Sequence, residues 1–449
     1  MARVSMPNSI TVEAPIERLL SPFQQFAKRS SAGGIVLLVC AVLALFWANS
    51  PVAESYFRLW NTPVEIRFGN LKLDKPLLLW INDGLMAIFF FLVGMEIKRE
   101  LLVGELASVR KAALSVAGAL GGMVMPVLIY ATLNWGTENV RGWGIPMATD
   151  IAFALGVLAL LGSRIPTALK VFLTALAIVD DVGAVLVIAI FYTENLKSHF
   201  LIYSLLFWGL MLGANRLGVR SALAYFLIGS VMWFFMLKSG VHATVAGVLA
   251  ALAIPVRSRI DPAHYIRCVR EYLSRFEKPY TTPQIILDPE QQSAVEAIEN
   301  ASLRVQSPLQ RLEHQLHYPV AFLIMPIFAL ANAGVALGGG SAVEWSNRAL
   351  WGIVLGLLLG KPIGIVGFSW LAIRLGITQL PKGITWVHLW GVGFLAGIGF
   401  TMALFIAQLA FRGSMLDLAK VGILIGSAIS CVIGFTLLRR WLHPQPELD

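Results

Sequence analysis

Apolar stretches of about twenty residues recur along almost the whole of this 449-residue chain. An α-helix of that length crosses the hydrocarbon core of a bilayer. Hydrophobic residues make up 57% of the sequence and charged residues only 14%, which excludes a water-soluble globular protein. The pattern predicts an all-α polytopic membrane protein with about twelve transmembrane helices. Their expected ranges are 32–49, 77–97, 112–133, 147–163, 167–192, 199–216, 221–236, 240–256, 318–338, 349–373, 386–410 and 419–438.

The basic residues predict the orientation of these spans. Of the 35 Lys and Arg, 24 fall in the two termini and in the loops on the same side of the membrane, and only Lys361 lies deep inside a span. The positive-inside rule then places both termini in the cytoplasm. The net charge of +9 follows from this loop bias, so no nucleic-acid partner is expected.

Two segments outside the membrane stand out. Between the first two spans, apolar and polar residues alternate on both sides of a Gly69-Asn70 turn, which predicts an extracytoplasmic β-hairpin at about 63–74. The second segment is polar and rich in Arg, Glu and Gln, and we expect surface helix and partly disordered loop there. The expected domains are a cytoplasmic segment 1–31, spans one to eight in 32–256, a cytoplasmic insert 257–310, spans nine to twelve in 311–440, and a cytoplasmic tail 441–449.

Asp180 and Asp181 are adjacent in the middle of the fifth span. Moving one carboxylate to the bilayer centre costs at least about 2.5 kcal/mol, so ionisable residues at this depth indicate an ion site, a proton relay or a ligand counter-ion. A buried structural ion pair is the alternative. Neighbours on a helix point about 100° apart, so the two carboxylates face different surroundings.

Three further features accompany the aspartate pair. Thr149 and Asp150 begin the short fourth span after Gly144 and Pro146, and glycines at 393, 397 and 399 interrupt the eleventh span just before Thr401. Interrupted helices at membrane depth are tolerated where they line a cavity or are buried in protein. Lys361 follows glycines spaced four residues apart, a pattern that lets another helix approach closely. The run before Lys361 mimics a phosphate-binding loop, but its spacer is one residue short and Pro362 replaces the Ser or Thr, so no nucleotide site is expected.

The chemistry of this set favours a hard cation. Carboxylate, hydroxyl and backbone carbonyl oxygens suit such ions, whereas the three cysteines are too far apart to form a transition-metal site. A paired-carboxylate site in a low-dielectric cleft holds either protons or a cation. Competition between the two, combined with alternating access, is sufficient for exchange. The residues alone leave two other functions open: a cation channel or pH-sensing membrane protein, and a sodium- or proton-coupled symporter.

Several long motifs resemble the bacterial NhaA-type sodium/proton antiporters, and the resemblance covers nearly the whole chain. The motifs are WINDGLMAIFFFLVGMEIKREL (80–101), ATDIAFALGVLALLGSR (148–164), ALAIVDDVGA (175–184), LKSGVHATVAGV (237–248), RLEHQLH (311–317), ANAGV (331–335), GKPIGI (360–365) and GIGFTMALF (397–405).

The resemblance implies a secondary transporter rather than an enzyme, without a cofactor, that exchanges Na+ or Li+ for a larger number of protons. It implies inverted-topology repeats in which spans four and eleven are unwound and cross, and a homodimer that meets through the hairpin. Asp181 is then the principal ion carboxylate, Asp180 its neighbour and Lys361 the partner of Asp180. The resemblance also implies that Thr149 and Asp150 lie at the crossing and that Asp83 lies near the family's ion-filled funnel. The residues it associates with pH response are Glu96, Arg99, Glu100, His242, Glu313, His314 and His317.

One departure limits the resemblance. The family has a short loop between the eighth and ninth spans, whereas about seventy residues separate His242 from Glu313 in this chain. The pH threshold therefore does not carry over.

Overall fold

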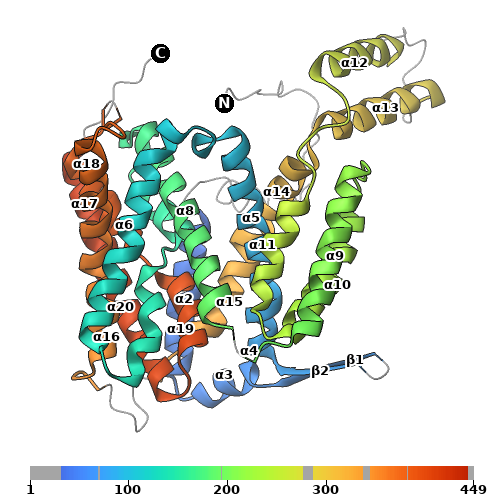
Figure 1. Cartoon of the computed structure of the whole chain (residues 1–449). Helices are drawn as coiled ribbons and strands as arrows, with labels where there is room; N and C mark the ends of the chain where they lie inside the picture. Colours follow the sequence, from blue (N-terminus) through green and yellow to red (C-terminus); the bar gives the residue numbers. More distant parts are fainter. Residues whose placement is uncertain are drawn as a thin grey trace.

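The computed structural model describes residues 32–68, 71–193, 195–276, 287–336, 344–381 and 383–442. Helices dominate this part of the chain and pack side by side as a bundle (Figure 1). The first half of the bundle contains α2 (Ala32–Ala48), α3 (Ala53–Trp60), α4 (Leu77–Trp80), α5 (Met86–Val103), α6 (Val109–Asn134), α7 (Ile151–Ala159), α8 (Thr167–Phe191), α9 (Ser198–Arg216), α10 (Ala222–Ser239) and α11 (Ala243–Ala253). The second half contains α14 (Pro308–Pro319), α15 (Met325–Asn332), α16 (Arg348–Leu355), α17 (Lys361–Arg374), α18 (Trp386–Ala396), α19 (Phe400–Ala410) and α20 (Ser414–Trp441).

The predicted mostly helical membrane protein is confirmed at this level. Among the described residues, eight helices are long and apolar enough to cross a membrane, and two bent helix pairs raise the number to ten. The helices α9 and α11 are outside these ten, so the full count of twelve spans remains a prediction. The ninth span also differs from expectation: it occupies Pro308–Asn332 rather than 318–338, because the Ser307 hydroxyl accepts from the Gln310 N–H and caps the new start.

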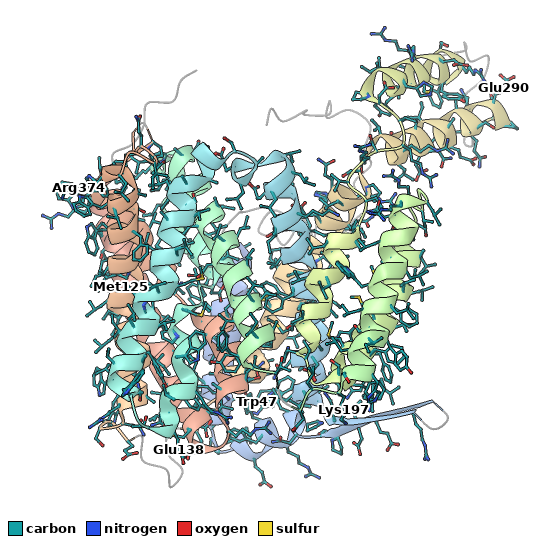
Figure 2. The ribbon with its side chains drawn as sticks, in the orientation of Figure 1. Trp47, Met125, Glu138, Lys197, Glu290 and Arg374 are labelled. Carbon is teal, nitrogen blue, oxygen red and sulfur yellow. The ribbon has the colours of Figure 1, made fainter. Side chains whose placement is uncertain are left out.

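The small antiparallel sheet is confirmed as well. Strand β1 (Pro63–Phe68) pairs with β2 (Leu71–Pro76) in a register that places Pro63 opposite Pro76, while the predicted Gly69-Asn70 turn lies outside the described residues. This hairpin extends from one end of the bundle, which we call the hairpin end (Figure 1). Glu138 and Lys197 lie at the hairpin end, and Arg374 lies at the opposite end (Figure 2).

The insert forms two helices, α12 (Pro262–Phe276) and α13 (Pro289–Val305), that project from the end opposite the hairpin, which we call the insert end (Figure 1). Their mutual contact includes a hydrogen bond of 3.1 Å between the hydroxyls of Tyr265 and Ser302. Residues 277–286, which connect them, are outside the described part of the chain.

Two interruptions divide helices inside the bundle. The residues at 148–150 separate a 3₁₀ helix, η3 (Glu138–Met147), from α7, and the residues at 397–399 separate α18 from α19, whose axes differ by 46°. The second interruption requires glycine. A Cβ on Gly397 would collide with the carbonyl oxygen of Leu357, and one on Gly399 would lie 3.0 Å from the carbonyl oxygen of Ala148. The two interruptions therefore lie against each other.

The spaced glycines before and after Lys361 bring α17 into close contact with α6. A Cβ on Gly364 would collide with the carbonyl oxygen of Gly121, and a Cβ on Gly121 would collide with the carbonyl oxygen of Gly364. The π-helical turn η6 (Gly356–Gly360) precedes Lys361 directly. Such turns often accompany functional sites.

This contact makes a testable prediction about stability. Gly364→Ala should lower the free energy of unfolding by about 1–3 kcal/mol, because the new methyl group overpacks a backbone contact. Gly367→Ala is the matched control on the same helix, since a Cβ there meets nothing within 4 Å, and it should be neutral or stabilising by up to about 1 kcal/mol. Thermal unfolding in detergent measures both. Equal unfolding temperatures for the two variants would contradict the prediction.

Candidate functional site

Lys361 and Asp180 form an ion pair in the centre of the bundle. The ammonium Nζ of Lys361 lies 2.8 Å from Oδ2 of Asp180 and donates a second hydrogen bond of 2.8 Å to the hydroxyl of Thr149. The exposed fraction is 0% for Lys361 and 1% for Asp180, so neither charge is hydrated by bulk water. Breaking a pair of this kind leaves an uncompensated buried charge, which is far more costly than losing a surface salt bridge.

Asp181 has a different environment from its neighbour. It is 3% exposed, and within the described part of the chain its carboxylate has neither a hydrogen bond nor an ion pair. The Oδ1 atom of Asp180 is likewise buried without a hydrogen-bond partner among the described residues. Adjacent carboxylate oxygens that no protein donor satisfies can accept either a proton or a cation.

Asp150 joins the two interruptions. Its backbone N–H donates to the carbonyl of Ile398 at 2.7 Å, while Oδ1 accepts from the N–H of Phe153 at 2.9 Å. Oδ2 accepts from both the N–H and the hydroxyl of Thr401. The carboxylate therefore faces the N-terminal ends of α7 and α19 together, where the partial positive charge of helix dipoles stabilises an anion.

Thr149 links the ion pair to the opposite kind of helix end. Its hydroxyl accepts from Lys361 and donates to the carbonyl of Ala396 at 2.8 Å, at the C-terminal end of α18. A cation is stabilised near such an end. Asp150 therefore lies at helix ends of positive partial charge, and Lys361 lies one hydrogen bond away, through Thr149, from a helix end of negative partial charge.

Asp83 and His242 lie together near the hairpin end. The Nζ of Lys75, in strand β2, is 2.6 Å from Oδ2 of Asp83, and Nε2 of His242 is 3.7 Å from Oδ1. Asp83 lies in a π-helical turn, η1 (Ile81–Leu85), and its carbonyl accepts from the indole of Trp233. The family resemblance places His242 in one pH-response set with Glu96 and Glu313. In the structure His242 instead caps the start of α11 beside Asp83.

Four of the expected pH-response residues lie together near the insert end, away from Asp83. They are Glu96, Arg99, Glu100 and Glu313. The guanidinium group of Arg99 lies 3.3 Å from Oε1 of Glu100, through Nη2, and 3.3 Å from Oε1 of Glu313, through Nε. The carboxylates of Glu96 and Glu313 interact electrostatically. His314 lines a surface cavity of about 390 Å³ with Arg311. His317 makes an edge contact with Tyr318.

Several contacting residues were missed from the sequence. Lys75 is the penultimate residue of β2, and the sequence gave no signal of its contact with Asp83. Asn82, Asn332 and Gln408 are polar residues inside apolar runs, a signal that was available but that does not tell which residues meet.

Many apolar helices enclose a buried ion pair, two interrupted helices, and a carboxylate that has no hydrogen bond or ion pair among the described residues. This combination is typical of the class of secondary ion transporters. The chain belongs to the Na+/H+ antiporter 1 family, whose model matches residues 24–438.

Individual relatives match over almost the full length. The chain is 52% identical over 436 residues to the Na(+)/H(+) antiporter NhaA of Oleidesulfovibrio alaskensis, which covers 96% of this chain and 97% of that protein. It is 48% identical over 435 residues to Na(+)/H(+) antiporter NhaA 1 of Saccharophagus degradans, covering 96% and 93%. Over 414 residues it is 48% identical to the NhaA of Helicobacter pylori, covering 92% and 93%.

Proposed function

We propose that the protein is a secondary active sodium/proton antiporter that exports Na+ in exchange for protons. One observation carries the proposal: of two adjacent buried carboxylates, Asp180 is paired with Lys361, whereas Asp181 has no hydrogen bond or ion pair among the described residues. The relatives named as Na(+)/H(+) antiporters support sodium and protons as the exchanged ions.

In the proposed cycle, Na+ and protons compete for the same oxygens. A sodium ion binds the carboxylates of Asp181 and Asp180, and Asp181 releases its proton. The carboxylate of Asp180 then binds the cation instead of the ammonium group of Lys361. Because this ammonium group has lost its partner, it can release a second proton. After the site opens to the other side, protons displace the ion and the Asp180–Lys361 pair forms again. Two protons for each sodium ion make the exchange electrogenic. Lithium presents the same charge to the same oxygen ligands and is expected to be a substrate as well.

The two interrupted helices provide the proposed route to alternating access. Spans four and eleven are proposed to be unwound and to cross at Thr149, Asp150 and residues 397–399, within inverted repeats of twelve spans. Both termini and the α12–α13 insert would lie in the cytoplasm of a bacterial inner membrane, with the hairpin outside. The hairpin is proposed to join two copies of the chain, since its strands expose pairing edges.

Proton flux in everted membrane vesicles tests the function. Addition of Na+ or Li+ to vesicles with an established proton gradient should cause proton release, whereas K+ should cause little. Release that requires a co-transported solute would indicate a symporter. Sodium conductance that proceeds without proton movement would indicate a channel, and either result would overturn the antiporter.

A further inference from the structure

Three amide side chains close into a ring near the hairpin end. The Nδ2 of Asn82 donates to Oε1 of Gln408, and Nε2 of Gln408 donates to Oδ1 of Asn332. The Nδ2 of Asn332 completes the ring by donating to Oδ1 of Asn82 at 3.0 Å. The three residues belong to η1, α19 and α15, so the ring joins three separate segments, and each amide both donates and accepts within it.

A layer of three aromatic rings comes from α19, from α15 and from α5, the helix that directly follows η1. The ring centroid of Phe405, in α19, is 5.8 Å from that of Phe90, in α5, and 6.2 Å from that of Phe328, in α15. All three phenylalanines are buried. His242 contacts the same layer, with its ring centroid 5.0 Å from that of Phe405.

The chain direction places the aromatic layer deeper than the amide ring. Phe405 precedes Gln408 by three residues and Phe328 precedes Asn332 by four, whereas Phe90 follows Asn82 by eight. Thr401, which bonds to Asp150, precedes Gln408 by seven residues, or roughly 10 Å along a helix. The order from the ion site toward the hairpin end is therefore the interrupted helices, the aromatic layer and the amide ring.

We propose that the amide ring and the aromatic layer are the barrier that closes the ion site from the extracytoplasmic side, and that the ring opens in each transport cycle. This inference rests on the proposed function and orientation. Opening separates α19 from α5 and α15. In the closed state the three amides satisfy one another without water, and in the open state water satisfies them. Because the three amides are hydrogen-bonded in both states, the free-energy difference between the closed and the open state stays small.

The barrier predicts how a single apolar substitution behaves. In Gln408→Leu, the closed state retains Nδ2 of Asn82 and Oδ1 of Asn332 in a buried place without a partner, while the open state still hydrates them. The population of the open state should therefore rise by at least about five-fold. In Gln408→Asn the amide is kept on a side chain one methylene shorter, which reaches its partners poorly, so the rise should be smaller.

For the triple variant Asn82→Leu, Asn332→Leu, Gln408→Leu we expect the opposite result, a population of the open state that does not rise. No amide is left unpaired in its closed state, and replacing all partners of a polar network by apolar groups is often nearly neutral. The barrier should close again, and opening should become less frequent than in the parent because water must then hydrate apolar side chains.

Labelling of a buried cysteine measures the open state directly. The background carries Cys40→Ser, Cys268→Ser and Cys431→Ser, and the reporter is Ala403→Cys, a small change on the ion-site side of Phe405 in a fully buried position. A membrane-impermeant cationic thiol reagent is added to right-side-out vesicles, and the labelling rate is normalised to the amount of full-length protein. The matched control is Asn134→Leu, which removes a buried amide that bonds to the carbonyls of Tyr130 and Arg348, away from the barrier.

The expected order of labelling rates is Gln408→Leu above Gln408→Asn, then the parent and Asn134→Leu, with the triple variant at or below the parent. Unchanged labelling in both Gln408 variants would overturn the barrier, as would an equal increase in Asn134→Leu. If Gln408→Leu does not reach the membrane, Gln408→Asn and the triple variant decide. Labelling requires no transport, so a failure of sodium/proton exchange in the parent refutes the proposed function separately from the barrier.

Discussion

Asp181→Asn should reduce sodium-triggered proton release in everted vesicles by at least about a hundred-fold. The amide is neutral and cannot take up a proton, so it removes both the charge that binds the cation and the proton exchanged for it. Two opposite unit charges 4 Å apart attract each other by about 4 kcal/mol at an effective dielectric constant of 20. A hundred-fold loss corresponds to about 2.8 kcal/mol, so removal of the charge is sufficient to explain it. The carboxylate is 3% exposed and has no hydrogen bond or ion pair among the described residues, so no neighbour would restore the charge.

Two further variants make this result specific. Asp181→Glu keeps a carboxylate and should retain measurable exchange with a changed apparent affinity for Na+. Glu138→Gln removes an exposed carboxylate at the hairpin end and should behave as the parent (Figure 2). Exchange of parental size in Asp181→Asn, at equal protein content, would remove Asp181 from the ion site.

The second large effect is on stability. Lys361→Met should lower the free energy of unfolding by about 3–5 kcal/mol, because it leaves the carboxylate of Asp180 charged and unpaired in a fully buried position. Protonation of Asp180 removes that charge. The loss of stability should therefore be largest in alkaline buffer and smaller in acidic buffer. Thermal unfolding in detergent across a pH series measures it.

A double variant separates the lost pair from a general packing defect. In Lys361→Met with Asp180→Asn no charge remains unpaired, so most of the stability should return and its pH dependence should weaken. Lys170→Ala, an exposed lysine on α8, is the control and should change stability by less than about 0.5 kcal/mol. A double variant as unstable as Lys361→Met would show that the ion pair is not the cause.

Local sequence was sufficient for the features that depend on neighbouring residues. Helix α8 begins at the predicted residue and ends within one of the predicted limit, because apolar length is a local property. The hairpin follows from alternation around a turn, which is also local. The close approach of α17 to another helix follows from the glycine spacing around Lys361, although the identity of that helix as α6 does not.

Features that depend on distant contacts were missed or misplaced. Asn49, Ser50 and Pro51 are a signal for the end of α2, but they do not specify that α3 leaves it at 115°. The resemblance gave His242 and Asp83 separate roles, yet His242 lies beside Asp83, which is 159 positions earlier in the chain. The amide ring joins Asn82 to Asn332 across 250 positions, and an amide in an apolar run does not specify its partner.

The sequence by itself determined that this chain is a polytopic membrane protein with two carboxylates in one span, because hydropathy and the cost of a buried charge act residue by residue. The pairing of Lys361 with Asp180 was expected only through the family resemblance, and the tertiary structure forms it at 2.8 Å. Only the tertiary structure decided that Asp181 is left without a hydrogen bond or ion pair among the described residues, and which backbone N–H groups bond to the Asp150 carboxylate. Those relations depend on how separate helices pack, and a buried polar group takes whichever partner the packing brings within reach.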